Sequence, residues 1–438
     1  MTNYVNYFGS NPTLPQDDDD AAQLPFDNPG DEQLSLAAEL EDCDAPQLTL
    51  HDDYTLENVP RGAWAEIDLS AIAYNVNQAR LAVGPKRLLM AVVKADAYGH
   101  GANRVAKAAL DAGADRLAVA TPEEGVKLRQ AGFKVPILLL AQPPIRTIPL
   151  LVAYDITPAV YTGEFALAYG EYADRRGKQA PFHLAVNTGM NRIGVFYLDA
   201  ADFIQSISFH RALKYEGTFT HFATADCPDQ YDFKEQVRRF EVALAQLRDA
   251  GISPGIVHAA NSASIFRYPQ VHYDMVRLGI CLYGLDYNSE VSQGSVQLKP
   301  AMSIKAEISA VKEPQVGDGV SYGMNYRVGK PVQIATLPLG YADGVRRELT
   351  KKGFKVLWNG RPVSQVGNIC MDQMMIEIPL GYSVDGIKGG GAQVGDEVVI
   401  IGTQGDYEVS ADTMAEALGT ITHEITCLFG IRLPRVYV

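Results

Sequence analysis

Short apolar runs alternate with amphipathic segments between residues 60 and 295. The apolar runs have unalternated interiors, which is typical of strands in a parallel sheet that is covered on both faces. The segments between them place apolar residues at helical spacing, which predicts helices, for example over 123–132 and 231–251. Eight strands are predicted, over residues 88–94, 116–121, 136–141, 157–160, 182–188, 215–223, 256–261 and 275–284.

Eight strands within residues 61–295, each followed by a helix or a turn, predict a TIM-type (β/α)8 barrel. A doubly wound sheet is the alternative, but no GxGxxG motif follows a first strand. Barrel enzymes collect their reactive groups at the carboxyl ends of the strands. Polar residues stand at these predicted ends, and they come from strands far apart in the sequence: Lys94, Asn187, His221, Asn261, Ser262, Arg277 and Gly279.

Residues 296–438 have a different pattern, with apolar and polar positions alternating between GDG, NG and GD turns. This alternation predicts an antiparallel, β-rich C-terminal domain. One late helix is expected over 410–425, with Ser410 or Asp412 as its N-cap. Polar motifs of this domain fall in turns, namely VSYGMNY (320–326), GYADGVRR (340–347) and GNICMDQ (367–373).

The net charge of −14 comes entirely from the first 60 residues. They contain 14 Asp and Glu and no Lys or Arg, which leaves 38 acidic against 38 basic residues in the rest. A segment so charged and so poor in apolar residues is expected to be a disordered acidic extension over residues 1–60. A neutral remainder carries no basic stripe, so a nucleic-acid partner is not expected.

The composition is that of a globular protein, with 47% hydrophobic and 21% charged residues. No apolar stretch approaches the roughly 20 residues that span a bilayer, so no membrane association is expected. The chain starts without a basic or apolar signal region. Five cysteines without CxxC spacing predict reduced thiols in the cytoplasm, and neither a disulfide framework nor a metal site.

Several motifs occur together in one order: AVVKADAYGHG, NTGMNRIG, THFATAD, NSAS, MVRLGICLYG, VSYG, GYADG and GNICMDQ. With them the chain resembles the bacterial alanine racemases, pyridoxal-phosphate (PLP) enzymes built of a barrel and a β-domain. The resemblance runs from GAWAEIDLSAIAYNV (62–76) to the end of the chain. It implies racemisation of L-alanine and D-alanine, with D-alanine supplied for cell-wall (peptidoglycan) synthesis.

The resemblance also assigns the cofactor site. Lys94 would hold PLP through a Schiff base, which needs an amine at the mouth of the barrel. Arg277 would face the pyridine nitrogen, and because an arginine does not give up its proton the ring would stay neutral. The phosphate would be bound by Tyr98, Ser262 and the amides of Gly279 and Ile280.

Racemisation needs a proton-transfer group on each face of the substrate Cα. The resemblance implies Lys94 on one face and Tyr322 of a partner subunit on the other, with the phenol polarised by His221 and Arg277 behind it. A homodimer with shared sites follows. Arg192 and Met371 would bind the substrate carboxylate, and Tyr341 and Asp226 would line the entrance.

Two departures from the family pattern bear on substrate choice. Ala185 stands where many members carry a carbamylated lysine, with Asn187 two residues further on, and this A-x-N-x-G pattern is closer to broad-spectrum amino-acid racemases. Ile431 replaces a tyrosine expected to touch the phosphate and the substrate side chain. Against a broad-spectrum enzyme, Ile193 follows Arg192 where that group tends to have asparagine.

Three alternatives therefore stay open. The first is a broad-spectrum racemase that acts on serine or basic amino acids. The second is a two-domain PLP-dependent decarboxylase, whose partner-chain proton donor is usually a cysteine, as Cys370 in GNICMDQ would be. The third is a non-catalytic PLP-binding protein, although such proteins have one domain and lack the VSYG and GYADG segments.

Overall fold

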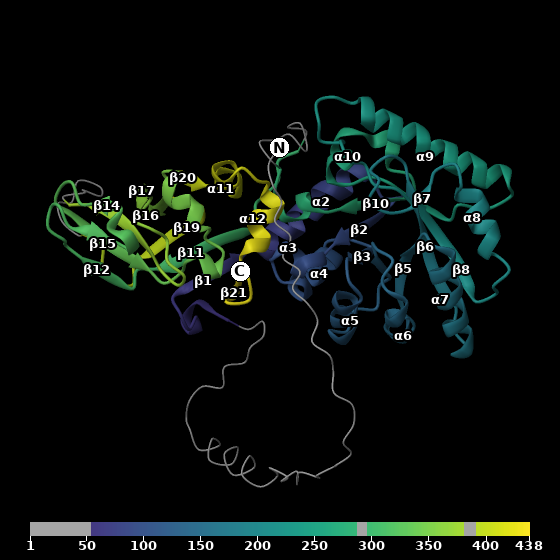
Figure 1. The fold of residues 1–438 in the computed structure, drawn as a ribbon, viewed down its shortest axis with the longest axis horizontal. Coiled ribbons are helices and arrows are strands. Elements are labelled where there is room, and N and C mark those ends of the chain that lie inside the picture. Colours follow the sequence, from purple (N-terminus) through teal and green to yellow (C-terminus); the bar gives the residue numbers. More distant parts are fainter. Residues whose placement is uncertain (1–53, 287–295, 381–390) are drawn as a thin grey trace, which may run out of the picture. The chain divides into compact units, whose positions relative to one another are not determined.

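The computed structural model describes residues 54–286, 296–380 and 391–438. A closed parallel barrel forms the first half, because its strands follow the order β5-β4-β3-β2-β10-β9-β8-β6 and β5 pairs back onto β6 (Figure 1). The predicted TIM-type barrel is confirmed, and each predicted strand is present. The barrel strands are β2 (Leu88–Val92), β3 (Arg116–Val119), β4 (Ile137–Leu139), β5 (Ile156–Val160), β6 (Ala180–Asn187), β8 (Leu213–Phe219), β9 (Ile256–His258) and β10 (Met275–Leu278), with β7 (Val195–Phe196) appended to β6.

The barrel helices begin at residues suited to capping. Thr121 accepts a hydrogen bond from the Glu124 amide, and Pro122 stands in the first turn of α5. Asp68 and Thr162 cap α2 and α7 in the same way. The helices are α2 (Leu69–Val83), α4 (Ala102–Asp111), α5 (Pro122–Gln130), α6 (Ile148–Ala153), α7 (Gly163–Arg175), α8 (Ala200–Ile207), α9 (Tyr231–Asp249) and α10 (Ser262–Arg267).

A ten-stranded sheet forms the second half and confirms the predicted β-rich domain. Its order is β12-β15-β18-β17-β16-β19-β11-β1-β21, with β20 paired to β19. Strand β1 precedes the barrel in sequence, yet it pairs antiparallel with β11 and parallel with β21. Residues 63–67, which the sequence placed in a barrel region of 61–295, thus belong to this sheet. The strands are β1 (Ala63–Ile67), β11 (Met302–Glu307), β12 (Ala310–Lys312), β15 (Val332–Leu337), β16 (Lys355–Trp358), β17 (Arg361–Val366), β18 (Met374–Pro379), β19 (Glu397–Gln404), β20 (Tyr407–Val409) and β21 (Arg435–Tyr437), and a separate hairpin joins β13 (Gly319–Val320) to β14 (Tyr326–Arg327).

The single late helix predicted over 410–425 is wrong, because the structure has two. Helix α11 (Ala411–Leu418) starts at Ser410, whose hydroxyl accepts from the Thr413 amide as expected. It ends at Gly419, which has φ of +70°, a conformation that glycine adopts without steric cost. A second helix, α12 (Thr422–Leu428), follows, and it carries a residue of this domain to the functional site described below.

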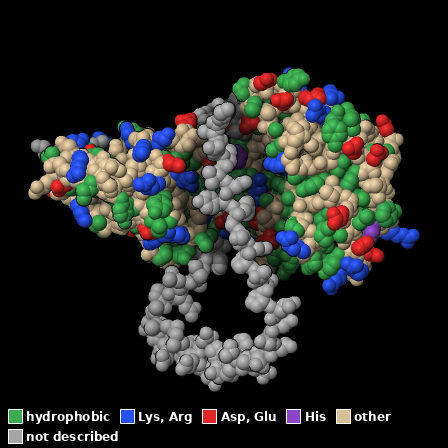
Figure 2. All heavy atoms as spheres, in the orientation of Figure 1, with side chains coloured by type: hydrophobic (Ala, Val, Ile, Leu, Met, Phe, Trp, Pro, Cys, Tyr) green, Lys and Arg blue, Asp and Glu red, His purple; other side chains and the backbone are tan. Residues whose placement is uncertain are grey.

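The acidic extension predicted over 1–60 lies mostly outside the described residues. Its last part is described and has regular structure: Tyr54 forms a β-bridge with Val436, and a 3-10 helix spans Leu56–Asn58. On the face shown in Figure 2, basic and acidic side chains are interspersed, so no single sign of charge dominates it. None of the helices in the described ranges is long and apolar enough to cross a membrane.

Candidate active site

A cavity of about 520 Å³ opens at the carboxyl ends of the barrel strands. Its charged lining consists of Lys94, Arg192 and Arg277 against the carboxylate of Asp226, so it suits anionic ligands. Residues predicted from strand ends far apart in the sequence do meet here. Those that line the cavity are Lys94, Tyr98, Arg192, His221, Asp226, Ser262, Arg277, Gly279 and Ile280.

Lys94 opens a turn of left-handed helix (α3, Lys94–Tyr98) just beyond strand β2. The four residues from Ala95 to Tyr98 have φ between +52° and +54°, and none of them is glycine. Such a conformation costs roughly 1–2 kcal/mol per residue for L-amino acids. The turn brings the Tyr98 ring back toward the lysine, whose Nζ lies 5.9 Å from the ring centroid. Nothing in the sequence indicated this turn.

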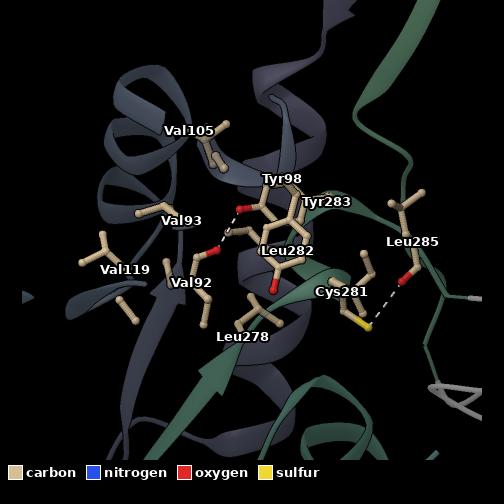
Figure 3. Packing of buried hydrophobic residues seen from close by; sticks show 14 of the residues in the cluster. Val92, Val93, Tyr98, Val105, Val119, Leu278, Cys281, Leu282, Tyr283 and Leu285 are labelled. Carbon is tan, nitrogen blue, oxygen red and sulfur yellow. Dashed lines mark hydrogen bonds between the residues drawn. The ribbon is translucent and has the colours of Figure 1, made fainter. Parts of the chain in front are cut away.

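Hydrogen bonds from neighbouring elements hold the left-handed turn. The carboxylate of Glu124 accepts from the Ala95 amide at 2.7 Å, and Asp96 accepts from the Ala102 amide at 2.8 Å. The buried Tyr283 hydroxyl donates to the Val92 carbonyl at 2.7 Å, and its ring packs 4.7 Å from that of Tyr98 (Figure 3). These contacts stabilise both ends of the segment and thereby fix the origin of the Lys94 side chain.

Ser262, Gly279 and Tyr98 form a cradle on one side of the cavity. The Ser262 hydroxyl accepts from the amides of Gly279 at 3.0 Å and Cys281 at 3.3 Å. A Cβ on Gly279 would lie 3.4 Å from the Tyr98 hydroxyl and 3.6 Å from Ser262 Oγ, and so would occupy the space between the two hydroxyls. Burial raises the pKa of Tyr98, so its hydroxyl stays protonated and can donate. The cradle therefore presents donors around an open space.

Arg277 is 3% exposed and directs its donors at fixed acceptors. Its Nη atoms donate to the carbonyls of Thr220, His258 and Ala259, and to Nδ1 of two histidines, His221 at 3.1 Å and His258 at 3.0 Å. A guanidinium has no acceptor, so both Nδ1 atoms must be unprotonated. Burial and the charge of Arg277 lower the pKa of His221 to about 3. His221 is accordingly neutral, and its proton sits on Nε2.

Lys94 is set up as a reactive amine. Burial, and after it the positive charge of Arg192, lower its pKa from the ordinary value, while Glu124 acts in the opposite direction. A lowered pKa increases the fraction of unprotonated amine near neutrality, which is the form that attacks a carbonyl or accepts a proton.

The loop that carries Arg192 is organised by Asn187, at the end of strand β6. The Asn187 side chain accepts from the amides of Gly189 and Asn191, both at 3.1 Å, and donates to the Asn191 side chain at 3.0 Å. Arg192 itself is exposed and has no hydrogen bond or ion pair within the described part of the chain. Ala185 packs with Ala159 and Phe219 and supplies no polar atom to brace it. Ala185 and Asn187, which form the first departure noted in the sequence, thus line the same cavity as Arg192.

The remaining predicted residues lie outside the cavity. Tyr322, Tyr341 and Met371 are 75%, 40% and 52% exposed. Their three loops are joined to one another: the Tyr341 amide donates to the Cys370 carbonyl at 3.0 Å, and the Asn368 side chain donates to the Tyr322 carbonyl at 2.7 Å. The structure therefore brings the three residues onto one connected group of loops but leaves them without contact to the cavity of the same chain.

Two positions of the C-terminal segment differ from expectation. Ile431 is 97% exposed and does not line the cavity, because the chain turns at Gly430 and buries Phe429 instead. Arg435 fixes this turn by donating to the carbonyls of Phe429, Gly430 and Leu433. His423 of helix α12, which the sequence did not single out, does line the cavity, with its ring 6.0 Å from that of Tyr98.

The structure combines a closed barrel, a lysine just beyond a barrel strand, a cradle of donors suited to an anion, and a β-rich second half. This combination defines a class of barrel enzymes. Family models match both halves: "Alanine racemase, N-terminal domain" over residues 67–287 and "Alanine racemase, C-terminal domain" over 301–437. An alanine racemase of Desulforamulus reducens is 44% identical over 377 residues, 86% of this chain and 98% of that protein. The chain belongs to the alanine racemase family, whose members depend on PLP.

Solved structures agree with this assignment. The alanine racemase of Clostridium difficile 630 superposes with a TM-score of 0.80 at 37% identity, covering 86% of this chain and 96% of that one. A histidine racemase from Leuconostoc mesenteroides subsp. sake superposes with a TM-score of 0.79 at 30% identity, covering 88% and 100%. Proteins of closely similar fold in this group are therefore named as racemases of different amino acids.

The residues present fit PLP. The space that a Cβ on Gly279 would fill lies between two hydroxyls, as a phosphate requires, and the cavity carries three cationic side chains against one carboxylate. Lys94 supplies an amine of lowered pKa within the same cavity. Sequence reasoning had already selected these groups.

Substituting Gly279→Ala should weaken PLP binding by more than ~10-fold, because the new methyl group displaces at least one hydrogen bond to a charged group. Fluorescence titration of the apoprotein with PLP measures the effect. Gly163→Ala is the control, since a Cβ there meets nothing within 4 Å. Equal affinities of the two variants would show that the cradle does not hold the phosphate.

The stability of the apoprotein should fall as the pH drops from about 6.5 toward 5. Burial lowers the pKa of His100 to about 4, and burial also lowers the pKa values of His183, His221 and His258. The unfolded chain then binds protons that the native state does not, so each such histidine removes up to about 1.4 kcal/mol per pH unit below its unfolded pKa. Urea unfolding at pH 7.5, 6.5, 5.5 and 5.0 measures this slope, and His100→Gln should flatten it. A constant free energy of unfolding across this range would contradict the buried neutral histidines.

Proposed function

We propose that this protein interconverts L-alanine and D-alanine by two acid–base groups that act on opposite faces of the substrate. The observation that carries the proposal is the neutral His221 held beside Arg277 in a cavity that also contains the amine of Lys94, whose pKa burial lowers. Lys94 and His221 both line this cavity, together with two further titratable groups, Asp226 and His423. The product would feed the cell-wall synthesis that the family resemblance implies.

PLP, when bound, supplies an electron-withdrawing ring that stabilises negative charge at the substrate Cα. Tyr98, Ser262 and Gly279 would hold its phosphate, and Arg277 would face its ring nitrogen. The guanidinium keeps its proton, since even with burial and Arg192 lowering its pKa to about 9 it stays charged at neutrality. Arg192 would bind the substrate carboxylate by charge-assisted hydrogen bonds.

Lys94, which lines the cavity, would act on one face of the substrate. Its unprotonated amine accepts the Cα proton of D-alanine, and its ammonium form returns a proton to the same face. Burial and the charge of Arg192 lower its pKa, which increases the share of the unprotonated amine that can accept a proton.

Tyr322 of the partner subunit would act on the opposite face. A phenol has an ordinary pKa of about 10 and needs help to accept a proton near pH 7. The His221 Nε2–H points its donor away from Arg277 and would donate to the phenol oxygen, which favours the phenolate. Removal of the Cα proton of L-alanine by that oxygen, followed by proton delivery from the Lys94 ammonium on the other face, gives D-alanine.

A homodimer with shared sites is the arrangement that joins these groups. Tyr322, Tyr341 and Met371 are exposed apolar or amphipathic side chains on connected loops, and none of them lines the cavity of its own chain. Exposed apolar groups collected in one region are typical of an interface. A second chain that places these loops over the cavity would complete both sites at once.

A broader substrate range is the second candidate, and Ala185 favours it. This residue is small and apolar where a larger residue is common in the family, and it lies in the cavity lining beside Ile193. The structural likeness to a histidine racemase supports the same reading. A decarboxylase would instead release carbon dioxide from L-lysine or L-ornithine, with Cys370 in place of Tyr322 as donor.

Mixing two inactive variants tests the shared site. Lys94→Ala and Tyr322→Phe should each lose roughly 10²–10⁴ of the racemase activity, the usual contribution of an acid–base group. After the two purified variants are unfolded and refolded together, half of the dimers are mixed, and one of their two sites has both groups intact. About a quarter of the wild-type activity should return. No gain above the separate variants would exclude a site built from two subunits.

Substrate preference is measured by chiral chromatography of the PLP-loaded enzyme with L-alanine, L-serine, L-lysine, L-arginine and L-histidine. We expect conversion of alanine to exceed that of the others by at least tenfold, about 1.4 kcal/mol of discrimination. Comparable conversion of a larger amino acid would establish the broad-spectrum alternative, and carbon dioxide release would establish the decarboxylase.

A further inference from the structure

A buried row of side chains continues from the active site into the interior of the barrel. Beyond Arg277, His258 Nε2 lies 2.8 Å from His183 Nδ1, and His183 Nε2 lies 3.9 Å from the Glu216 carboxylate. Glu216 in turn accepts from Arg116 at 2.7 Å. His258 and His183 are 0% and 1% exposed, so both imidazoles are shielded from bulk solvent. The proposed chemistry uses none of these four residues.

The hydrogen bonds from Arg277 to His258 and from His258 to His183 run in one direction, and the last link, from His183 Nε2 to the Glu216 carboxylate at 3.9 Å, is an electrostatic contact longer than a hydrogen bond. Arg277 can only donate, so His258 accepts on Nδ1 and carries its proton on Nε2. That proton is donated to Nδ1 of His183, which therefore carries its own proton on Nε2, facing Glu216. A carboxylate can only accept hydrogen bonds, so Glu216 is the kind of group that the Nε2 proton of His183 has to face. If either imidazole carried its proton on the other ring nitrogen, two donors or two acceptors would face each other in the row.

The row also connects a buried cation with a distant anion. None of the contacts of Arg277 in the described chain is to a carboxylate, although isolated buried charges are costly. The two imidazoles remain neutral, because burial lowers the pKa of both. Glu216 stays ionised, since His183 and after it Arg116 lower its pKa to about 2. Glu216 is thus the anionic end of a row whose cationic end is Arg277.

The backbone is arranged to make room for this row. Strand β6 pairs with β8 in register up to Phe182 and Tyr215, and then His183 pairs with Gly217, so that Glu216 is an extra residue, a β-bulge. A bulge turns a side chain to a face it would not otherwise reach. At Gly217 a Cβ would lie 2.6 Å from the His183 ring, so glycine leaves the space that the ring occupies. Phe219 packs against the His258 ring at 5.0 Å, nearly parallel, and holds its plane.

We propose that Glu216, acting through His183 and His258, is a positioning residue that fixes the orientation and hydrogen-bond polarity of Arg277 at the cofactor ring. The inference deepens the proposed function and rests on it for the role of Arg277. Under this proposal, side chains in the interior of the barrel contribute to cofactor binding as well as to packing.

The test compares Glu216→Gln with Asp115→Asn. Glutamine keeps the size of the side chain but removes the charge and can turn a donor toward His183. Asp115 is the control because its carboxylate pairs with Arg80, at 2.6 Å, and with no residue of the row. Fluorescence titration of each apoprotein should show PLP affinity about tenfold weaker for Glu216→Gln and within twofold of wild type for Asp115→Asn.

In the PLP-loaded Glu216→Gln enzyme, kcat should fall while the KM for alanine stays within twofold of wild type, because Arg192 and not Arg277 binds the substrate.

Nitrogen-15 NMR of the histidine-labelled wild-type apoprotein supplies a reading that requires no variant. His183 and His258 should both be neutral with the proton on Nε2, and Glu216→Gln should abolish this single state for His183. A protonated or Nδ1–H form of either ring in the wild type overturns the inference, as does unchanged PLP affinity in Glu216→Gln. If the wild-type protein binds PLP and shows these tautomers but racemises nothing, the proposed function fails while the positioning row stands.

Discussion

The one-way hydrogen bonding of Arg277 is the constraint on which the site depends. A guanidinium offers only donors, and this one is buried near the carboxyl end of strand β10. Carbonyls at the ends of β8 and β9 accept some of its hydrogen bonds, and the Nδ1 atoms of two imidazoles accept the others. Each imidazole then presents its proton on the far side. One proton faces the cavity, where a phenol would need it, and the other starts the row toward Glu216.

Charge and backbone strain are concentrated in the same small volume. Four consecutive residues in left-handed conformation follow Lys94, and three cationic groups share the cavity. Both features are unfavourable by themselves, the first by steric strain and the second by repulsion and desolvation. The surrounding barrel is closed and closely packed, and Tyr283 and Glu124 tie the strained turn to it. Bound anions would offset the repulsion, which explains why a site of this composition should favour phosphate and carboxylate ligands.

The two halves of the chain are less separate than their sequence patterns indicate. Strand β1 lies before the barrel in sequence but between β11 and β21 in the sheet, so the second half contains strands from both ends of the described chain. Arg435 donates to the Gly99 carbonyl, next to the turn that follows Lys94. His423 reaches the cavity from helix α12. The β-rich half therefore supports the site of its own chain, while Tyr322 and Met371 on its loops are exposed.

The sequence by itself determined the eight barrel strands, the β-rich second half and most cavity residues. It did so because apolar periodicity is a local property and because parallel strands must bring their carboxyl ends to one edge, where Lys94, His221 and Arg277 stand. Only the tertiary structure decided the rest. The left-handed turn depends on Glu124 and Tyr283, which are distant in sequence, and the burial of Phe429 in place of Ile431 depends on the turn that Arg435 stabilises. The row from Arg277 to Glu216 joins residues of β10, β9, β6 and β8 through a bulge that no spacing reveals. Its members meet only because the barrel closes, and contacts across a closed barrel are set by register and packing, which a linear pattern does not specify.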